Sequence, residues 1–261
     1  MNQPRQADAA PERVTLADVR ASLNPAVKSH FTVAWFGRPI ANLVTPAFYN
    51  AGWSANGVSL ARAALALLGL GALLSLRSWA GAAAAAVFYA CFVLDCVDGN
   101  IARLRNSVTY WGKYLDGLAD SVFVLGAPLA AGTGLWLHGG PAWAMLAGAL
   151  ITIGSLTSQM TRGRLSFMRE WMINQSGPVE AQVLERLKAP RRVQAWAAAV
   201  LVNGTFFAPL LLLVPTDGPL WYVLALLAVH LAPELVWTAT TLIEARILLD
   251  RGRRSIHAAL R

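Results

Sequence analysis

The chain has 261 residues, of which 56% are hydrophobic and only 14% are charged. A soluble domain of this composition would be unusual, so the composition argues against soluble enzyme classes and favours one polytopic membrane domain. The formal net charge of +8 is compatible with nucleic acid or with an anionic surface. Because the apolar runs favour the anionic cytoplasmic leaflet of a membrane, we expect a lipid bilayer and no nucleic acid as partner.

The N-terminal part of the chain precedes the apolar runs. Residues 1–25 are rich in polar and charged side chains with little periodicity, which predicts a flexible cytoplasmic tail. Residues 26–56 mix aromatic and aliphatic side chains with a few basic ones, a pattern typical of an amphipathic helix in the membrane interface. Pro39 and Pro46 are expected to break this helix into pieces.

Six apolar segments follow, each near the ~20 residues that a helix needs to cross a bilayer. They cover residues 58–76, 79–94, 118–137, 143–160, 193–214 and 220–242. The sequence therefore predicts an all-α polytopic membrane protein. Its six transmembrane helices occupy residues 57–248, and a basic cytoplasmic tail over residues 249–261 ends the chain.

The positions of the basic residues predict the orientation of these spans. With the N-terminus in the cytoplasm, Arg77 alone among the 22 Lys and Arg residues falls near an outer loop. The others lie in the tails, the inner loops or the inner helix ends, as the positive-inside rule requires. We therefore expect both termini and residues 95–120 on the cytoplasmic side.

Four carboxylates interrupt the apolar sequence, at Asp95, Asp98, Asp116 and Asp120. Each pair is three or four residues apart, so on a helix its two members share one face. Ionised side chains on membrane segments are costly and usually functional. If the two helices are neighbours, the four carboxylates converge and would repel one another strongly without divalent cations between them.

Ligands that offer only oxygen suit Mg²⁺ or Mn²⁺, with Ca²⁺ also possible, and no Cys or His joins the group to suggest zinc. Two such ions can clamp a diphosphate and stabilise an in-line displacement. Gly99 leaves room for a ligand near the backbone, and Arg103 could hold a phosphate. The residues thus predict metal-dependent phosphoryl transfer at a membrane surface. The alternative is that the aspartates cap helices and pair with Arg103, Arg105 and Lys113.

The same stretch completes a longer pattern, D-x2-D-G-x2-A-R-x8-G-x3-D-x3-D, and through it the sequence resembles the CDP-alcohol phosphotransferase family of integral membrane enzymes. Its fixed positions are Asp95, Asp98, Gly99, Ala102, Arg103, Gly112, Asp116 and Asp120. The resemblance covers about residues 35–250. It implies an enzyme of phospholipid biosynthesis that moves a phosphatidyl or phospho-alcohol group from a CDP-linked donor, such as CDP-diacylglycerol, to an acceptor hydroxyl and releases CMP.

The resemblance also implies a role for each residue. Asp95, Asp98 and Asp116 would ligate two divalent ions, and Asp120, near the second ion, would be the general base for the acceptor hydroxyl. The remaining motif residues would surround the CDP moiety, and they are Gly99, Ala102, Arg103 and Gly112. Because family members are commonly homodimers, the resemblance implies a homodimer here.

A second stretch resembles the family less closely. Many members carry Pro-Asn-x-x-Thr-x-x-Arg where the chain enters the first span, and here residues 55–62 read Ala-Asn-Gly-Val-Ser-Leu-Ala-Arg. Ala55 replaces the proline, and Ser59 replaces the threonine but keeps a hydroxyl. Asn56 could line the donor site; alternatively, Ser54 or Asn56 caps the helix.

The acceptor is left open by the sequence. Members that act on phosphorylated polyols often carry Tyr-x-Arg-Ala-Arg at the inner end of the fourth span, where this chain keeps Arg162 and Arg164 but not the Tyr or Ala. The two arginines favour inositol phosphate or glycerol phosphate, or else they only anchor the helix end. An amino alcohol (choline, ethanolamine or serine) is the alternative acceptor. His230 and Glu234 form either a hydrogen-bonded contact or a polar wall of the acceptor pocket.

Two further classes of function are compatible with the acidic cluster: a divalent-cation transporter and a catalytically inactive protein that binds CDP-lipid. A transporter needs polar groups across the whole bilayer, yet the outer half has almost no acidic residue besides Asp217. An inactive relative would not need the complete set of four aspartates. Both observations favour the enzyme.

Overall fold

The computed structural model describes residues 13–23, 30–75, 79–175, 177, 191–215 and 217–259, without the side chains of residues 191 and 251–259. These residues form helices and connecting turns, with no strand among them. Six helical segments are long and apolar enough to cross a membrane. They are α3 (Ala55–Ser75), α4 (Ala80–Leu104), α5 (Tyr110–Leu137), α6 (Ala142–Gln175), α8 (Arg191–Phe207) with its 3₁₀ continuation η2 (Ala208–Leu213), and α9 (Gly218–Ala259). The all-α, six-span prediction is confirmed, and the chain is an integral membrane protein.

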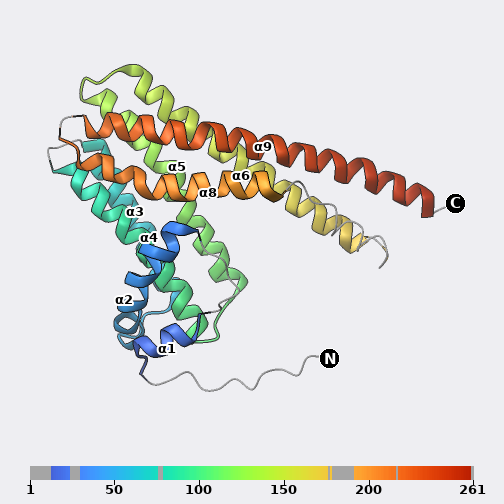
Figure 1. Cartoon of the computed structure of the whole chain (residues 1–261), viewed down its shortest axis with the longest axis horizontal. Helices are drawn as coiled ribbons and strands as arrows, with labels where there is room; N and C mark the ends of the chain where they lie inside the picture. The colour runs from blue at the N-terminus through green and yellow to red at the C-terminus, as the bar shows by residue number, and fades with distance from the viewer. Residues whose placement is uncertain are drawn as a thin grey trace.

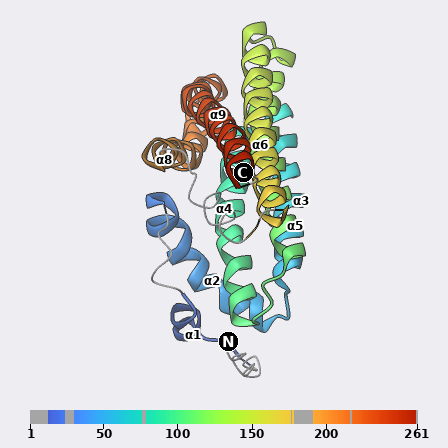
Figure 2. The same ribbon diagram turned by 90° about the vertical axis from the view of Figure 1, so that its right-hand side faces the viewer.

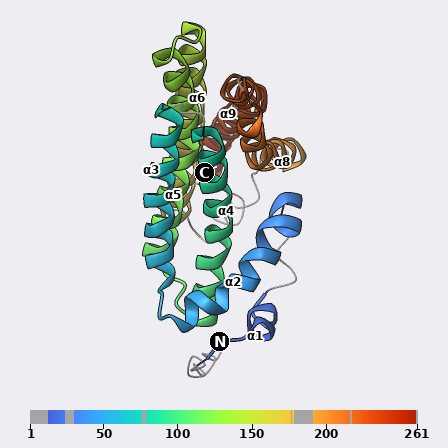
Figure 3. The same cartoon turned by 90° about the vertical axis from the view of Figure 1, so that its left-hand side faces the viewer.

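The spans do not pack simply in chain order, because α3 packs against both α4 and α5, and α6 packs against both α5 and α9. Helices α3, α4, α5 and α6 stand side by side in Figures 2 and 3, and α9 lies along α6 in Figure 1. The core between them is rich in alanine around Phe88, Phe123 and Leu226. A Cβ atom on Gly132 of α5 would collide with the backbone carbonyl of Ala144 on α6. Helices α5 and α6 therefore pack backbone against backbone, as small residues permit in membranes.

The segment before the first span is helical without a break from residue 31 to residue 50. It contains a π-helical turn (Val33–Gly37) followed by α2 (Arg38–Asn50). Pro39 lies in the first turn of α2 and Pro46 lies inside it, so the expectation that these prolines break the helix is wrong. Burial of one face of α2 against α4 offsets the hydrogen bond that the proline cannot make. The location of α2 in a membrane interface stays a prediction.

Residues 13–23, which the sequence assigns to a flexible tail, form a short helix, α1 (Leu16–Ala21), that packs on α2. Thr15 and Asp18 form a reciprocal cap at the start of α1. The Asn50 side-chain amide ties α1 to α2, because it both accepts from the Val14 N–H (2.9 Å) and donates to the Val14 carbonyl (3.0 Å). The first 12 residues of the predicted tail lie outside the described part of the chain.

Helices α4 and α5 both continue beyond the apolar segments that predicted them. Helix α4 runs ten residues past the predicted end, to Leu104, and α5 begins at Tyr110 rather than near residue 118. A short turn joins them, in which Asn106 adopts a left-handed conformation (φ 48°). All four aspartates of the motif therefore lie on helices. Figure 2 shows α1 and α2 beside the end of the bundle where α4 ends and α5 begins.

Candidate active site

The carboxylates that the sequence singled out come together between α4 and α5. One oxygen each from Asp95, Asp98 and Asp116 can be chosen so that all three lie within 4.8 Å of one another. The fourth, Asp120, reaches the same place, because its Oδ1 lies 3.2 Å from the Arg62 guanidinium that also contacts Asp95 and Asp116. The predicted convergence of four carboxylates is therefore present in the fold.

These carboxylates differ in their access to solvent. The Asp98 side chain is buried, those of Asp95 and Asp116 are about two-fifths exposed, and that of Asp120 is 60% exposed. A ligand that approaches from outside the bundle would thus meet Asp120 first. The graded exposure separates one accessible carboxylate from three that lie deeper.

Arg62 of α3 is the counter-ion of the cluster, a role that the sequence reasoning missed. Its side chain is only 4% exposed, forms an ion pair with Asp95, and donates to Oδ1 of Asp116 at 2.7 Å and to the Asp116 carbonyl at 2.9 Å. The signal was present in the sequence, since Arg62 is the last residue of the second motif. One guanidinium facing four carboxylates leaves an excess of three negative charges if all are ionised.

The rest of the second motif also points at the cluster. Ser59, one turn before Arg62, donates its hydroxyl to Oδ2 of Asp98 at 2.7 Å, so the serine that replaces the family threonine holds a motif aspartate. Ser54 caps α3 by accepting from the Gly57 N–H at 3.0 Å. Asn56 instead lies beside Gly112, because a Cβ atom added to Gly112 would lie 3.0 Å from Oδ1 of Asn56. This contact brings two of the predicted donor-binding residues together.

Arg103 is held by a polar cluster between α2 and α4. Its Nη2 donates to Oδ1 of Asn100 at 2.6 Å, and its guanidinium lies against Gly99. The buried Asn100 in turn donates to Oδ1 of Asn42 (3.0 Å) and to the Thr45 hydroxyl (2.9 Å), both on α2. Two side chains of α2 thus fix, through Asn100, the arginine that the resemblance assigns to the nucleotide. Ala102 lies half-buried beside it on α4.

The basic residues that the sequence offered as alternative partners of the aspartates do not form ion pairs with them. Arg103 binds Asn100, and Arg105 lies over the Tyr49 ring at 4.7 Å. Among the described residues, no ion pair joins the four aspartates to Arg103, Arg105 or Lys113. Pairing with neighbouring basic residues therefore does not explain why the cluster is acidic.

The cluster fits divalent metal ions. Its donors are carboxylate oxygens, which hard cations such as Mg²⁺ and Mn²⁺ prefer, and three of them converge from two helices. The negative charge that Arg62 leaves uncompensated gives such ions an electrostatic reason to bind. Asp95, Asp98 and Asp116 are the residues that would hold them.

Arg162 and Arg164, the two arginines of the predicted acceptor site, point to different sides of α6. Arg162 faces α9, where its Nη1 lies 4.0 Å from Oε2 of Glu234 and its guanidinium lies 4.3 Å from the Trp237 ring centroid. Arg164 is exposed, because two residues along a helix turn a side chain by about 200°. Instead Arg169, two turns further on, shares with Arg162 a cavity of about 410 Å³ between α6, α8 and α9.

Comparison with known proteins supports these observations. The family model described as CDP-alcohol phosphatidyltransferase matches residues 53–233, more than half of the chain. The match spans α3 to η2 and the first part of α9, as far as residue 233, and it includes every residue of both motifs. The helices before α3 lie outside the match. Among curated proteins, no match is found.

Proposed function

The chain belongs to the CDP-alcohol phosphatidyltransferase family, whose members transfer groups from a CDP-alcohol in phospholipid synthesis, and from this premise we propose its reaction. The phosphatidyl group of a donor such as CDP-diacylglycerol passes to the hydroxyl of an acceptor alcohol, and CMP is released. The observation that carries the proposal is the convergence of Asp95, Asp98 and Asp116 beside the accessible Asp120. In this proposal, residues 57–248 form the catalytic domain.

The three deeper carboxylates would hold two divalent ions, Mg²⁺ or Mn²⁺, with Asp120 close to the second. Such ions, when bound, would neutralise the diphosphate and the charge that develops on the leaving CMP. Ser59 supports this role because its hydroxyl bond orients the Asp98 carboxylate. Arg62 keeps the remaining carboxylates in place from the side of α3.

Asp120 would be the general base. Its side chain is the most exposed of the four, so an acceptor hydroxyl can reach it. Asp120 takes the hydroxyl proton, the freed oxygen forms a bond to the phosphorus that carries diacylglycerol, and the bond from that phosphorus to the CMP oxygen breaks. The electron pair of that bond leaves with CMP. The contribution of Asp120 comes from placement at the reacting hydroxyl rather than from high basicity.

The donor nucleotide would lie along α4 and the start of α5. Arg103, held by Asn100, can bind a phosphate oxygen through its guanidinium. Gly99 and Gly112 keep the adjoining backbone free of side chains, and Asn56 beside Gly112 offers an amide to the nucleotide. Ala102, from the same motif, would lie in the same wall.

The acceptor would enter between α6 and α9. Arg162 and Arg169 present guanidiniums on one side of α6, which favours an acceptor with a phosphate, such as inositol phosphate or glycerol phosphate. The exposed Arg164 would then act at the rim rather than in the cavity. An amino-alcohol acceptor is the alternative, because Glu244, which forms an ion pair with Arg169, lines the same cavity and could attract an ammonium group. We also propose a homodimer with both termini and the active site on the cytoplasmic side.

The proposal is tested with the purified full-length protein in detergent. CDP-diacylglycerol and Mg²⁺ or Mn²⁺ are supplied with a panel of acceptors, and released CMP is measured. We expect CMP release that requires a divalent ion and is fastest with a phosphorylated polyol. Folded protein that releases no CMP with any acceptor or CDP-linked donor would refute the reaction, whereas a preference for choline, ethanolamine or serine would replace only the acceptor.

A further inference from the structure

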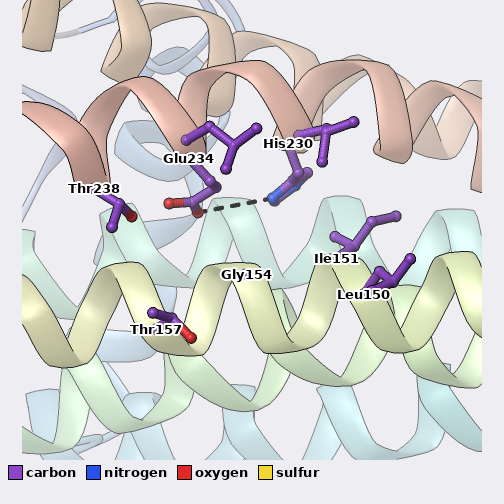
Figure 4. A pocket seen from close by; sticks show the side chains of 9 residues that line it. Leu150, Ile151, Gly154, Thr157, His230, Glu234 and Thr238 are labelled. Atoms are coloured by element: carbon purple, nitrogen blue, oxygen red, sulfur yellow. Dashed lines mark ion pairs between the residues drawn. The ribbon is translucent and has the colours of Figure 1, made fainter.

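Most arginines in the candidate site and its cavities face a carboxylate. Arg62 contacts three aspartates of the cluster, and Arg169 forms an ion pair with Glu244. Arg162 lies 4.0 Å from Glu234, which Figure 4 shows on α9 where that helix faces α6. In these places the protein itself balances the positive charge.

Arg38 of α2 and Arg103 of α4 are different. Neither forms an ion pair with a carboxylate among the described residues. Arg103 donates to the neutral side chain of Asn100, and its Nε makes no hydrogen bond in this part of the chain. Both arginines are partly buried, and they lie close enough for their charges to repel each other. Such repulsion is costly unless an anion lies between the two charges.

The register of α2 on α4 explains why the two guanidiniums meet. Near the start of α2, a Cβ atom on Gly37 would lie 3.4 Å from the sulfur of Cys96. Further along both helices, the side chain of Asn42 accepts a hydrogen bond from Asn100. The helices therefore run alongside each other in the same direction, which places Arg38 at the level of Cys96.

Arg103 reaches back along α4 towards this level. Its guanidinium lies 3.4 Å from the position of a Cβ atom on Gly99. Because residues three apart share a helix face, Cys96 and Gly99 both lie on the side where Arg103 lies. The charge of Arg38 acts on both Cys96 and Arg103, as this register requires. The two guanidiniums therefore lie on one side of α4, about one turn apart.

The carboxylate cluster borders this pair of arginines. Asp95 and Asp98 flank Cys96 on α4, and the charge of Asp98 attracts Arg103. An anion between the guanidiniums would thus lie beside the residues that would hold the divalent ions. A diphosphate is the anion that the proposed reaction brings to this place, and forked guanidinium contacts suit its oxygens.

The surroundings change from polar to apolar along α4. From the end of α4 into the span, the guanidinium of Arg103 comes first and Arg38 comes second. An apolar cavity of about 250 Å³ follows between α2, α4 and α8, and its lining includes Tyr89, Val93 and Phe206. This order matches the donor, in which the nucleotide phosphate is followed by the phosphate that carries the lipid, and then by the lipid itself.

We propose that Arg38 binds the phosphate that carries the lipid of the CDP-linked donor, while Arg103 binds the phosphate of the nucleotide. Both contacts rest on the proposed function, because they belong to its donor. Arg38 then touches the phosphate that the acceptor attacks and stabilises the charge on it. The family match begins at residue 53, so Arg38 lies outside the part of the chain that defines the family.

Calorimetry with the full-length protein in detergent and Mg²⁺ tests the two contacts separately. CDP carries both phosphates, whereas CMP carries only the phosphate of the nucleotide. Arg38→Gln should weaken CDP binding about tenfold, the effect of losing one charge-assisted hydrogen bond, and should leave CMP binding unchanged. Arg103→Gln should weaken the binding of both ligands.

Two further variants separate a phosphate contact from a structural role. Arg105→Gln is the matched control, because Arg105 lies at the same boundary of α2 and α4 but over the ring of Tyr49. It should bind CDP and CMP as the unaltered protein does. Arg38→Lys keeps the charge but not the planar fork, so its affinity for CDP should lie between those of Arg38→Gln and the unaltered protein. Arg38→Lys also decides the question if thermal unfolding shows that Arg38→Gln does not fold.

Steady-state release of CMP from CDP-diacylglycerol is a second measurement. With the acceptor that the unaltered protein uses, Arg38→Gln should lower kcat about a hundredfold, near the low end for removing one group that stabilises a reacting centre. Arg105→Gln should keep the kcat of the unaltered protein. A loss of stability alone would instead reduce the binding of CDP and CMP together.

The outcomes distinguish the contact of Arg38 from the proposed function. Unchanged CDP binding in folded Arg38 variants would overturn the contact and leave the proposed function standing. Equal losses of CDP and CMP binding would overturn the assignment of Arg38 to the phosphate that carries the lipid. An unaltered protein that binds neither ligand in Mg²⁺ would refute the proposed function, and the contact with it.

Discussion

At the scale of single residues, the candidate site is organised by a buried arginine, Arg62, that lies among the four carboxylates. Hydropathy and spacing were sufficient to predict that the four aspartates form one site, because their positions recur at helical intervals in an apolar sequence. The roles of Arg62 and Ser59 could not be predicted in the same way. They depend on how α3 packs against α4 and α5, and this packing brings residues 33 to 54 positions apart into contact.

Arg62→Gln is expected to destabilise the metal-free protein. Removal of the guanidinium leaves the carboxylates without a counter-ion, at a cost of about 3 kcal/mol, near the low end for breaking a buried pair because the aspartates are partly exposed. Thermal unfolding in the presence of a chelator measures the loss, and added Mn²⁺ should restore much of it. Arg20→Gln, at an exposed position of α1, should change neither value. An Arg62→Gln protein as stable as its parent in chelator would contradict the counter-ion role.

Asp120→Asn should lower the rate of CMP release at least about a hundredfold, because the amide cannot take the acceptor proton. Binding of the CDP-linked donor, measured by calorimetry, should change little, since Asp95, Asp98 and Asp116 remain. Asp217→Asn, in the turn before α9, is the matched control and should keep full activity. Unchanged turnover in the Asp120 variant would remove Asp120 as the base.

The cap of α1 predicts a response to acid. The Thr15 hydroxyl and the Thr15 backbone N–H donate to the Asp18 carboxylate and lower its pKa below the usual 3.8. A carboxyl with a lowered pKa in the folded state adds stability above the unfolded pKa and loses it as the pH falls through the folded pKa. We therefore expect α1 to loosen only below pH 3.8.

A spin label at Ala21→Cys, in a protein without the other cysteines, would report this loosening as increased mobility. Asp18→Ala should make the label mobile already at neutral pH and remove the acid response. A response that persists in the Asp18→Ala protein would show that another group controls α1.

At the scale of helices, the apolar segments predicted which spans exist but not where the helices end. Helices α4, α5 and α6 continue past the predicted limits, because the polar residues there lower the hydropathy without breaking the helix. The break expected at Pro46 also failed, since packing of α2 on α4 outweighs the propensity of one residue. Hydropathy measures transfer into lipid, whereas these helix ends are stabilised by contacts within the protein.

The close approach of α5 and α6 can be tested with a bulky substitution. Gly132→Leu would drive a side chain into the backbone carbonyl of Ala144 and should destabilise the protein by more than ~3 kcal/mol, above the usual cost of overpacking. Gly117→Leu, on the same helix in open space, should be tolerated in the same thermal unfolding experiment. Equal stability of the two variants would show that α5 and α6 can separate without cost.

At the scale of the whole molecule, the fold and the family followed from the sequence, but the orientation in the membrane stays a prediction. It depends on the distribution of Lys and Arg, since hydropathy alone does not distinguish the two sides of a bilayer. The cavity that contains Arg162 and Arg169 could not be predicted either. It forms where α6, α8 and α9 meet, and its residues are separated by up to about 80 positions in the chain.

Single cysteines test the orientation in intact cells. In a background without Cys91 and Cys96, a membrane-impermeant maleimide should label Asp217→Cys from outside. Ser107→Cys, in the turn between α4 and α5, should be labelled only after the membrane is permeabilised. The reverse pattern would place the carboxylate cluster on the outer side and contradict the cytoplasmic active site.

The link from α2 through Asn100 to Arg103 has a consequence for regulation. Asn100 joins the arginine to Asn42 and Thr45, while Ile40 and Leu43 on the same helix stay exposed. If those apolar side chains lie in the membrane surface, the tension and lipid composition of that surface would shift α2. Through Asn100, this shift would change how tightly Arg103 binds the donor. The enzyme would then adjust its affinity for a lipid precursor to the state of the membrane that its product enlarges.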